Sequence, residues 1–343
     1  MAKANKYGIH RVISPQGVLP QAATKIDNNM KIYSNEILID VQSLNIDSAS
    51  FTQIKNDVGA DADKIATRVM EIVKEKGKMQ NPVTGSGGML IGSIAKIGED
   101  LDIDLKVGDK IATLVSLSLT PLKIENVKAV HMNTDRVDIE GQAILFETGI
   151  YAKLPSDMTE ELALAALDVA GAPAQTAKLA KPGDSVLILG GAGKSGMMCC
   201  YEAKKRVGPT GKVVAAVINE EERDKLVSSN LCHEVVIADA TKPIEVLEKS
   251  LVVNAGQEYD LSINVVNVPN TEMSTILPVR DAGIAYFFSM ATSFTKAALG
   301  AEGVGKDVMM IVGNGYTKGH AEITLEALRE SPVLRKIFEE KYV

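Results

Sequence analysis

VLILGGAGKSG, at residues 186–196, is the stretch that decides the fold. It begins as a short apolar strand and ends in Gly191, Gly193 and Gly196, whose spacing is G-x-G-x-x-G, and an amphipathic segment follows. Between a strand and a helix, such glycines let the backbone turn sharply and approach a pyrophosphate closely. The stretch therefore predicts a dinucleotide-binding site.

The residues around this turn support that interpretation. Lys194 and Ser195 open the helix, so we expect the backbone N–H groups there and the positive end of the helix dipole to face phosphates. A second apolar strand is predicted at 212–218, as a βαβ unit requires. The triplet GKS also suggests a P-loop, but that loop needs glycine where Ile188 stands, and we reject it.

Composition restricts the class of protein. The chain has 343 residues, enough for two domains, and a net charge of −7 with no long basic run, which disfavours nucleic acid and anionic membranes as partners. No apolar run approaches the roughly 20 residues of a membrane span, and the N-terminus lacks the apolar core of a secretory signal. The three cysteines, including the adjacent Cys199 and Cys200, suit small apolar packing. We expect a cytoplasmic protein.

The pattern along the chain changes near Leu154. Before it, residues 36–44 alternate as a strand and residues 61–76 have helical spacing. Residues 85–119 form a segment of predicted strands joined by glycine turns. After it, strands alternate with helices, which is typical of an α/β, doubly wound parallel sheet. The later segments are helices at 162–169, 197–206, 223–229 and 321–329 and strands or apolar runs at 186–189, 213–218, 235–238, 261–266, 284–288 and 308–312. We expect the helix at 321–329 to pack on the sheet.

Four segments of the chain carry a resemblance to known proteins. They are EILIDVQSLNIDS (36–48), GSGGMLIGSIAKIG (85–98), KVGDKIA (106–112) and LALAALDVAGAPAQTA (162–177). These segments resemble the medium-chain dehydrogenase/reductase superfamily. The resemblance implies a GroES-like β-rich catalytic and substrate domain at 1–160. It also implies a Rossmann dinucleotide-binding domain with a C-terminal helix at 161–343, and a homodimer or homotetramer.

The zinc ligands of that superfamily are absent from this sequence. Alignment of the motifs puts Asp47 at the first ligand position, Gly88 and Met89 at the second, and Val169 at the third. A catalytic zinc needs about three protein ligands, and only Asp47 offers a suitable atom. The four cysteines of the structural zinc lobe are missing too, so we predict no metal, with proton transfer left to acidic and basic side chains.

Six longer strings point to one family within the superfamily. They are YGIHRVISPQGVLPQ (7–21), NIDSASFTQIKND (45–57), NPVTGSGGMLIGS (81–93), ATLVSLSLTPLKI (112–124), ILFETGIYAKLP (144–155) and DVAGAPAQTA (168–177). These strings resemble the L-erythro-3,5-diaminohexanoate dehydrogenases. The resemblance implies NAD- or NADP-dependent oxidative deamination of that diamino acid to 5-amino-3-oxohexanoate and ammonium, in anaerobic lysine degradation. The residues by themselves lead only to a zinc-free nicotinamide oxidoreductase.

Four residues are candidates for proton transfer. Asp47, in the turn after a strand, is the first choice, with Ser48 beside it as a relay, although both residues also suit a simple turn. Asp168 lies in an otherwise apolar helix, where a carboxylate is costly unless it is paired or faces a cleft; the alternative is an exposed helix face. Glu147 follows an apolar strand and is expected to face the same cleft.

Substrate and cofactor need further partners. His10 and Arg11 are candidates for the substrate carboxylate, and a surface position is the alternative. Asn219 ends the second strand of the dinucleotide unit, where it suits a ribose hydroxyl of NAD.

Arg223 suits the 2′-phosphate of NADP, while the intervening glutamates oppose it, so NAD is slightly favoured and the choice stays open. Pro173 and Gln175 are expected near the nicotinamide, as in the matching superfamily segment.

Two other functions remain possible from the sequence. One is a zinc-free quinone or enoyl reductase of the same superfamily. The other is a cofactor-binding or sensor protein without catalytic activity.

Overall fold

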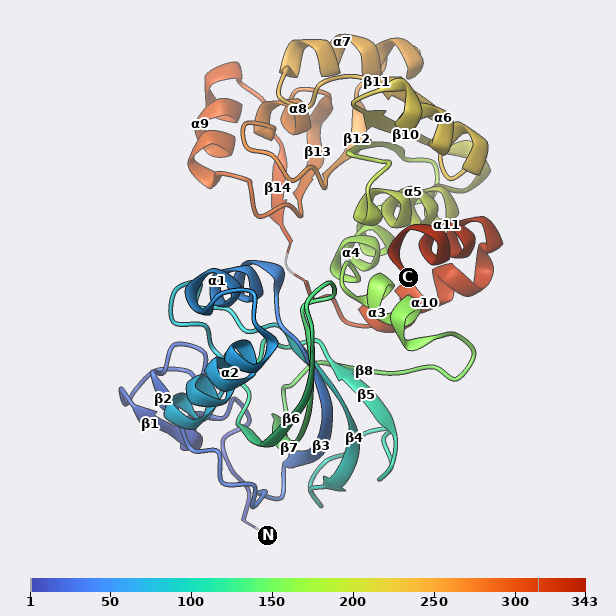
Figure 1. Cartoon of the computed structure of the whole chain (residues 1–343). Helices are drawn as coiled ribbons and strands as arrows, with labels where there is room; N and C mark the ends of the chain where they lie inside the picture. The colour runs from blue at the N-terminus through green and yellow to red at the C-terminus, as the bar shows by residue number, and fades with distance from the viewer. Residues whose placement is uncertain (1, 314) are drawn as a thin grey trace. The chain divides into compact units, whose positions relative to one another are not determined.

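The structure is a computed structural model that describes residues 2–313 and 315–343. The chain divides into two compact units, Met1–Ser156 and Asp157–Val343 (Figure 1). Among the described residues, no helix is long and apolar enough to cross a membrane.

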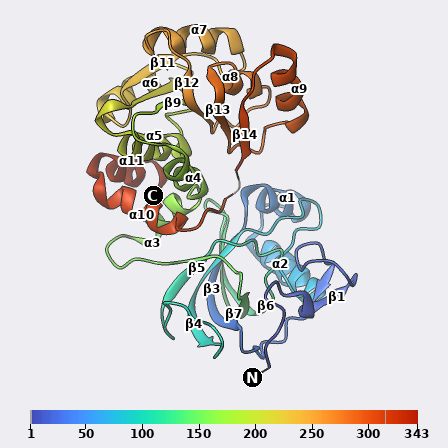
Figure 2. The same cartoon turned by 180° about the vertical axis from the view of Figure 1, so that it is seen from behind.

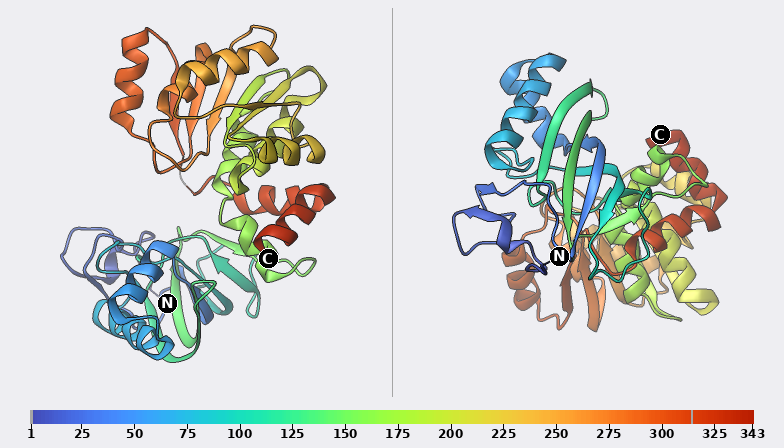
Figure 3. Two further views of the ribbon diagram at one scale, coloured as in Figure 1. Left: turned by 45° about the horizontal axis from the view of Figure 1, so that its top comes forward. Right: turned by 90° about the horizontal axis from the view of Figure 1, so that it is seen from below.

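Unit 1 is built on a six-stranded antiparallel sheet in the order β6-β7-β3-β4-β5-β8. Helices α1 and α2 lie along one side of the curled sheet (Figure 3, right). Its elements are η1 (Ile9–Arg11), β1 (Val12–Ser14), β2 (Lys25–Ile26), β3 (Glu36–Asn45), α1 (Ser48–Val58), α2 (Ala62–Lys76), β4 (Met89–Ile97), β5 (Lys110–Thr113), β6 (Leu122–His131), β7 (Arg136–Phe146) and β8 (Tyr151–Lys153).

The core of unit 1 follows from the two periodicities. Strand β3 alternates, so that Leu44 and Ile46 enter the core, while α2 supplies a stripe at helical spacing that includes Ile65, Val69 and Ile72. The pairing of β3 with β4 and with β7 shifts register between Val41 and Ser43, which marks a bulge in the strand. The strand predicted at 36–44 and the helix predicted at 61–76 are confirmed.

Unit 2 holds a six-stranded parallel sheet in the order β11-β10-β9-β12-β13-β14. Its strands are β9 (Ser185–Leu189), β10 (Lys212–Val217), β11 (Glu234–Ile237), β12 (Tyr259–Asn264), β13 (Val279–Phe287) and β14 (Met309–Val312). Its helices are α3 (Glu160–Leu167), α4 (Gly171–Leu179), α5 (Lys194–Val207), η2 (Gly208–Thr210), α6 (Glu220–Ser229), α7 (Pro243–Val253), α8 (Glu272–Ile276), α9 (Phe294–Val304), α10 (His320–Glu330) and α11 (Pro332–Tyr342).

The strand order fixes which helices cover which face. The chain moves outward from β9 to β10 and β11, and then returns to β12 and continues to β14. Because parallel crossovers are right-handed, α5 and α6 cover one face and α7 to α9 the other (Figure 2). The α/β class, with a β-rich unit followed by a doubly wound parallel sheet, is confirmed.

Two expectations about the helices of unit 2 are wrong. The apolar segment predicted as one helix to 169 ends at Leu167, and a second helix starts at Gly171. Helix α10 packs mainly against α3, α4, α5 and α11, and not directly on the sheet as expected. All three cysteines are buried, and burial raises the pKa of the Cys199 thiol to about 12, in keeping with packing.

Candidate active site

The glycine turn of unit 2 closes tightly over the end of β9. Gly190 has φ +83°, and the N–H groups of Gly190 and Gly191 both donate to Ala216 O, at 3.0 and 3.2 Å. A Cβ at Gly196 would stand 2.1 Å from Gly190 O, and a Cβ at Gly191 would stand 2.6 Å from the Ala215 Cβ. The backbone therefore leaves no room for a side chain at either position.

Unlike Gly191 and Gly196, the start of α5 at Gly193 has space for a ligand. Gly193 is the N-cap residue, no side chain caps the helix, and a Cβ at Gly193 would meet only Gly190 O, at 3.5 Å. The first N–H groups of a helix have no partner within it, so the N-terminus of this 14-residue helix suits an anion.

The turn lies at the point where the strand order of unit 2 reverses. Strands β9 and β12 are neighbours, Val265 N donates to Leu189 O, and a Cβ at Gly190 would meet Val266 Cγ2 at 2.9 Å. Open α/β sheets bind ligands outside the carboxyl ends of the strands at such a switch point. The three glycines thus have the geometry that a dinucleotide needs.

Lys194 and Asp168 form an ion pair at this turn. Lys194 Nζ lies 2.9 Å from Asp168 Oδ2 and 5.2 Å from the centre of the Tyr342 ring. The Asp168 side chain is paired with lysine and 65 % exposed at the end of α3, which agrees with the alternative of an exposed helix position. An exposed carboxylate that is paired with lysine needs no catalytic role to explain it. Ser195 is half-buried in the first turn of α5.

The end of β10 carries the residues predicted to contact the ribose. Asn219 caps α6, because its Oδ1 accepts from Glu222 N at 2.9 Å. Arg223 is exposed and forms ion pairs with Glu220 at 2.6 Å and Asp224 at 3.0 Å. These carboxylates raise the pKa of Arg223 and already compensate its charge.

Helix α4 carries the two residues predicted near the nicotinamide. Pro173 lies buried in the first turn, where its missing N–H has no helical partner to lose. Gln175 is half-buried, and its Oε1 accepts from Thr317 Oγ1 at 2.8 Å, which ties α4 to the segment before α10.

In unit 1, Asp47 stands where β3 gives way to α1. Its Oδ1 caps the helix by accepting from Ser50 N at 3.0 Å, while its Oδ2 is buried without a hydrogen-bond partner. Ser48 Oγ donates to Asp135 Oδ2 at 2.7 Å, in the turn between β6 and β7. The turn function and a free carboxylate oxygen therefore coexist in one residue.

The second position of the superfamily's zinc site is closed to side chains. Gly88 has φ +90°, and a Cβ there would stand 2.0 Å from Asn45 O and 2.8 Å from Asp47 N. The backbone thus has no space for a histidine at the position that the superfamily resemblance aligns with the second zinc ligand. In the part of the chain that the structure describes, no three His, Cys, Asp or Glu side chains gather into a metal-binding group.

Three predicted residues lie at the other end of the unit 1 sheet. In the β3–β7 ladder, Asn45 pairs with Arg136 and Glu36 with Phe146. Positions 36 and 45 are nine residues apart, about 30 Å at about 3.4 Å per residue. Glu147, which follows Phe146, is therefore remote from Asp47, and the expectation that both face one cleft is wrong.

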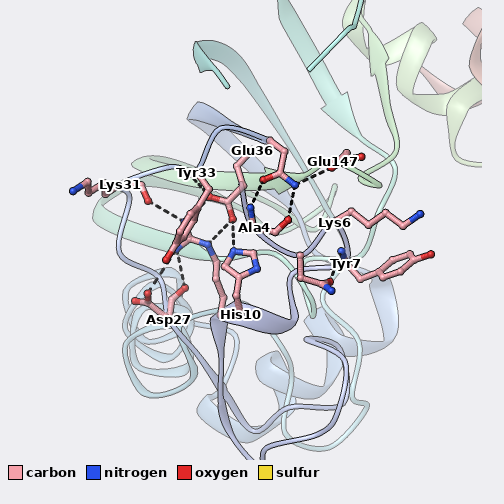
Figure 4. A network of polar contacts seen from close by, with 12 residues as sticks. Ala4, Lys6, Tyr7, His10, Asp27, Lys31, Tyr33, Glu36 and Glu147 are labelled. Atoms are coloured by element: carbon pink, nitrogen blue, oxygen red, sulfur yellow. Dashed lines mark hydrogen bonds and ion pairs between the residues drawn. The ribbon is translucent and has the colours of Figure 1, made fainter. Parts of the chain in front are cut away.

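His10 binds Glu36 at this remote end (Figure 4), and Arg11 binds the same carboxylate. Arg11 is 1 % exposed, and its Nε and Nη2 donate to the two oxygens of Glu36 at 2.7 and 2.6 Å. Its remaining donors reach the carbonyl oxygens of Asp27, Asn29 and Lys31. All of its nitrogens are engaged, which argues against binding of a substrate carboxylate.

Glu36 shows what this network is for. Burial would raise the pKa of Glu36, but hydrogen bonds from Arg11 and His10 outweigh burial and lower it to about 2. Glu147 is exposed and accepts from Asn35 Nδ2 at 2.8 Å (Figure 4). This end of the sheet secures the N-terminal segment.

The sequence reasoning missed polar residues beside Asp47. Ser43 Oγ and Asn45 Oδ1 are also buried without a hydrogen-bond partner. Arg136 stands opposite Asn45 on β7 and donates from Nε to Asp138 at 2.7 Å. The alternation of polar residues with Leu44 and Ile46 was the available signal.

Fold and site together define a class of protein. A doubly wound sheet with a G-x-G-x-x-G turn at its switch point, in a chain that also holds a unit with an antiparallel sheet, is a fold shared with oxidoreductases of known structure. A mycobacterial quinone oxidoreductase of known structure aligns over 94 % of this chain and 87 % of its own, with 16 % identity and a TM-score of 0.53. A 2-haloacrylate reductase aligns over 92 % and 85 %, with 14 % identity and a TM-score of 0.54. At these identities the likeness concerns the fold.

Sequence relatives define the family. Residues 10–155 match the L-erythro-3,5-diaminohexanoate dehydrogenase N-terminal domain. The L-erythro-3,5-diaminohexanoate dehydrogenase of Acetoanaerobium sticklandii is 71 % identical, over 99 % of this chain and 100 % of the relative. The enzyme of that name from Fusobacterium nucleatum is 67 % identical over 100 % of both chains. The chain belongs to the L-erythro-3,5-diaminohexanoate dehydrogenase family and is an oxidoreductase, as predicted.

Proposed function

We propose that this chain oxidatively deaminates L-erythro-3,5-diaminohexanoate to 5-amino-3-oxohexanoate and ammonium, in anaerobic lysine degradation. NAD or NADP accepts the hydride, and a carboxylate moves protons without a catalytic metal. The identity of 71 % over nearly the whole chain is the observation that carries the substrate assignment.

The glycine turn of unit 2 supports the nicotinamide cofactor. A side chain at Gly196 would collide with the Gly190 backbone and one at Gly191 with the Ala215 side chain, whereas Gly193 leaves the start of α5 accessible. We assign the N–H groups of Lys194, Ser195 and Gly196 to the pyrophosphate. When bound, the nicotinamide supplies the hydride acceptor.

Asp47 is the residue that we assign to proton transfer. The substrate amine must be neutral before hydride leaves the carbon that bears it, because an ammonium has no lone pair to form the iminium. The unpartnered Oδ2 of Asp47 suits the proton of that amine. Once this proton has passed to solvent, the same carboxylate can take a proton of the water that adds to the iminium and return it to the nitrogen that leaves as ammonia. Ser48 holds Asp135 and orients the start of α1 beside this carboxylate.

The chemistry of the three aligned ligand positions supports a reaction without zinc. Gly88 offers no ligand atom and has no space for one, and Val169 is apolar, so Asp47 would stand alone. A single carboxylate does not make a catalytic zinc site. We expect dialysis against a chelator to leave turnover unchanged.

We propose NAD as the preferred cofactor. Asn219 offers hydrogen bonds to a ribose, and Arg223 is already paired with Glu220 and Asp224. The acidic first turn of α6, Glu220 to Glu222, would repel a 2′-phosphate. A Kd for NADH below that for NADPH, from fluorescence titration, is the expected result.

Reduced-nicotinamide absorbance tests the reaction directly. The purified protein should reduce NAD when 3,5-diaminohexanoate is added, and release ammonium in equal amount. Turnover of a quinone with NADPH, without reaction of the diamine, would favour a quinone or enoyl reductase. Cofactor binding without turnover of either compound would favour a non-catalytic sensor protein.

A further inference from the structure

One face of β3 carries a row of polar side chains next to the proposed catalytic residue. Leu44 belongs to the core of unit 1, so its neighbours Ser43 and Asn45 on β3 share the opposite face. Asp47 follows Asn45 by two residues, past the buried Ile46, and has extended backbone as the N-cap of α1. Each of the three has a buried oxygen without a hydrogen-bond partner. Buried polar atoms are almost always satisfied, so three in a row require an explanation.

The strand end that carries this row is rigidly held. Asn45 pairs with Met89 on β4 and with Arg136 on β7, so hydrogen-bonded strands flank it on both sides. Gly88 presses against Asn45 O so closely that a Cβ would stand 2.0 Å away. Fixed backbone on both sides positions two side chains well enough to discriminate between ligands.

The charge around the row is negative. Arg136 is the cation next to Asn45, and Asp138 already pairs with it at 2.7 Å. Asp47 and Asp135 add two carboxylates at the same end, and Asp135 accepts a hydrogen bond from Ser48. Free acceptor oxygens in a negatively charged setting suit ammonium groups.

We infer that Asn45 and Asp47 form a recognition pair for a 1,3-diamine, in which Asn45 Oδ1 accepts from the ammonium that does not react. This inference rests on the proposed function and adds the means by which the substrate's two amino groups are distinguished.

The different chemistry of the two side chains makes that distinction. Asp47 is basic and can take a proton, so the amine beside it becomes neutral and able to lose hydride from its carbon. The amide oxygen of Asn45 accepts a hydrogen bond but does not take a proton. The amine at Asn45 therefore stays an ammonium, cannot form an iminium, and serves as an anchor.

The spacing fits this assignment. Residues two apart on a strand lie about 6.7 Å from each other, with side chains on the same face. The two amino groups of the substrate stand on carbons that one methylene separates. One substrate molecule can therefore place its 3-amino group at Asp47 and its 5-ammonium at Asn45.

The test compares two substrates in matched variants. We would measure kcat/KM for 3,5-diaminohexanoate and for 3-aminohexanoate, which lacks the 5-amino group, in the wild type, Asn45→Ala and Asn45→Asp. Gln42→Ala is the control, because Gln42 is exposed on the same strand. Thermal unfolding checks that the variants are folded.

The wild type should prefer the diamine by about 10- to 100-fold, the usual value of a hydrogen bond to a charged group. Asn45→Ala should reduce that preference to near one, mainly through KM of the diamine. Asn45→Asp should keep the preference for the diamine, because aspartate still offers an acceptor, but should also oxidise some substrate at the carbon of the 5-amino group, because aspartate takes a proton. Gln42→Ala should keep the preference. A merely structural role of Asn45 would lower kcat/KM for both substrates by the same factor.

Two results would overturn the inference and leave the proposed function intact. The first is a wild type that turns over both compounds equally. The second is an Asn45→Ala variant that keeps the full preference. A wild type that does not oxidise the diamine at all would overturn the proposed function and this inference with it.

Discussion

The buried Arg11–Glu36 pair gives a prediction with a defined size. Both side chains are 1 % exposed, and Glu36 accepts from two nitrogens of Arg11 and from Tyr33 N. Glu36→Gln would leave the buried Arg11 guanidinium with only the half-exposed Asp27 carboxylate, 3.8 Å away, as a counter-charge. Breaking one side of a buried pair typically costs about 3 to 5 kcal/mol.

The pKa of Glu36 gives an independent measure of the pair. The pKa falls from 4.5 to about 2 on folding, so the ionised form is favoured in the folded state. A carboxylate whose pKa is lowered on folding stabilises the folded state at pH values above its unfolded pKa. That stabilisation is lost as the pH falls toward the folded pKa. The shift corresponds to about 3 kcal/mol at pH 7, of which about 2 kcal/mol is lost by about pH 3.

Denaturant unfolding of unit 1 at several pH values provides the assay. The free energy of unfolding of Glu36→Gln should lie about 3 kcal/mol below that of the wild type at pH 7. The gap should shrink by about 2 kcal/mol by about pH 3, since only the wild type loses this interaction. Glu147→Gln, at an exposed glutamate of the same sheet end, is the control and should change little. A gap that is absent at pH 7, or that stays constant with pH, would refute the reasoning.

Four further substitutions test the candidate site. Asp47→Asn keeps the helix cap, because asparagine caps as well as aspartate. It should unfold like the wild type while kcat falls by about 10²- to 10⁴-fold, and near-normal turnover would remove Asp47 from proton transfer. Gly193→Val should fold but lose NADH binding in fluorescence titration. Gly196→Ala, with its Cβ 2.1 Å from Gly190 O, should lose NADH binding and also unfold at a lower temperature than the wild type. Equal Tm values for Gly196→Ala and the wild type would contradict this geometry. Gly88→Ala places a Cβ 2.0 Å from Asn45 O and also strains the backbone, because φ is +90°. The backbone strain alone costs about 1 to 3 kcal/mol, so the free energy of unfolding should fall by more than that in denaturant unfolding. A variant as stable as the wild type would mean that the position accepts a side chain.

The fold was largely readable because its signals are local. The glycine turn and the apolar strand before it specify the dinucleotide unit within a few residues, and the alternation at 36–44 specifies β3. Helix α1 escaped notice because its apolar positions are few, and the residues that begin it read equally well as a turn. The break between α3 and α4 was also hidden, since Ala170 and Gly171 fit a continuous helix as well as a junction.

The candidate site was readable only in part. The three glycines could be proposed from spacing, since they lie between a strand end and a helix start, whereas Asp47 was proposed because the superfamily resemblance aligns it with the first zinc-ligand position. Arg11 and Glu147 were misplaced, because no local pattern shows that Glu36 binds the first and that β7 carries the second to the remote end of the sheet. Such facts depend on partners far away in the sequence.

The sequence by itself determined the class of fold, the dinucleotide turn and the absence of ligand-type side chains at two of the three zinc positions. The tertiary structure decided which polar residues share an end of the unit 1 sheet, that Gly88 has no space for a side chain, and that Asn45 and Asp47 keep unpartnered oxygens. The reason is physical. Periodicity and turn chemistry act over a few residues, whereas the register of an antiparallel ladder and the contacts of a backbone are set by strands that meet only when the chain is folded.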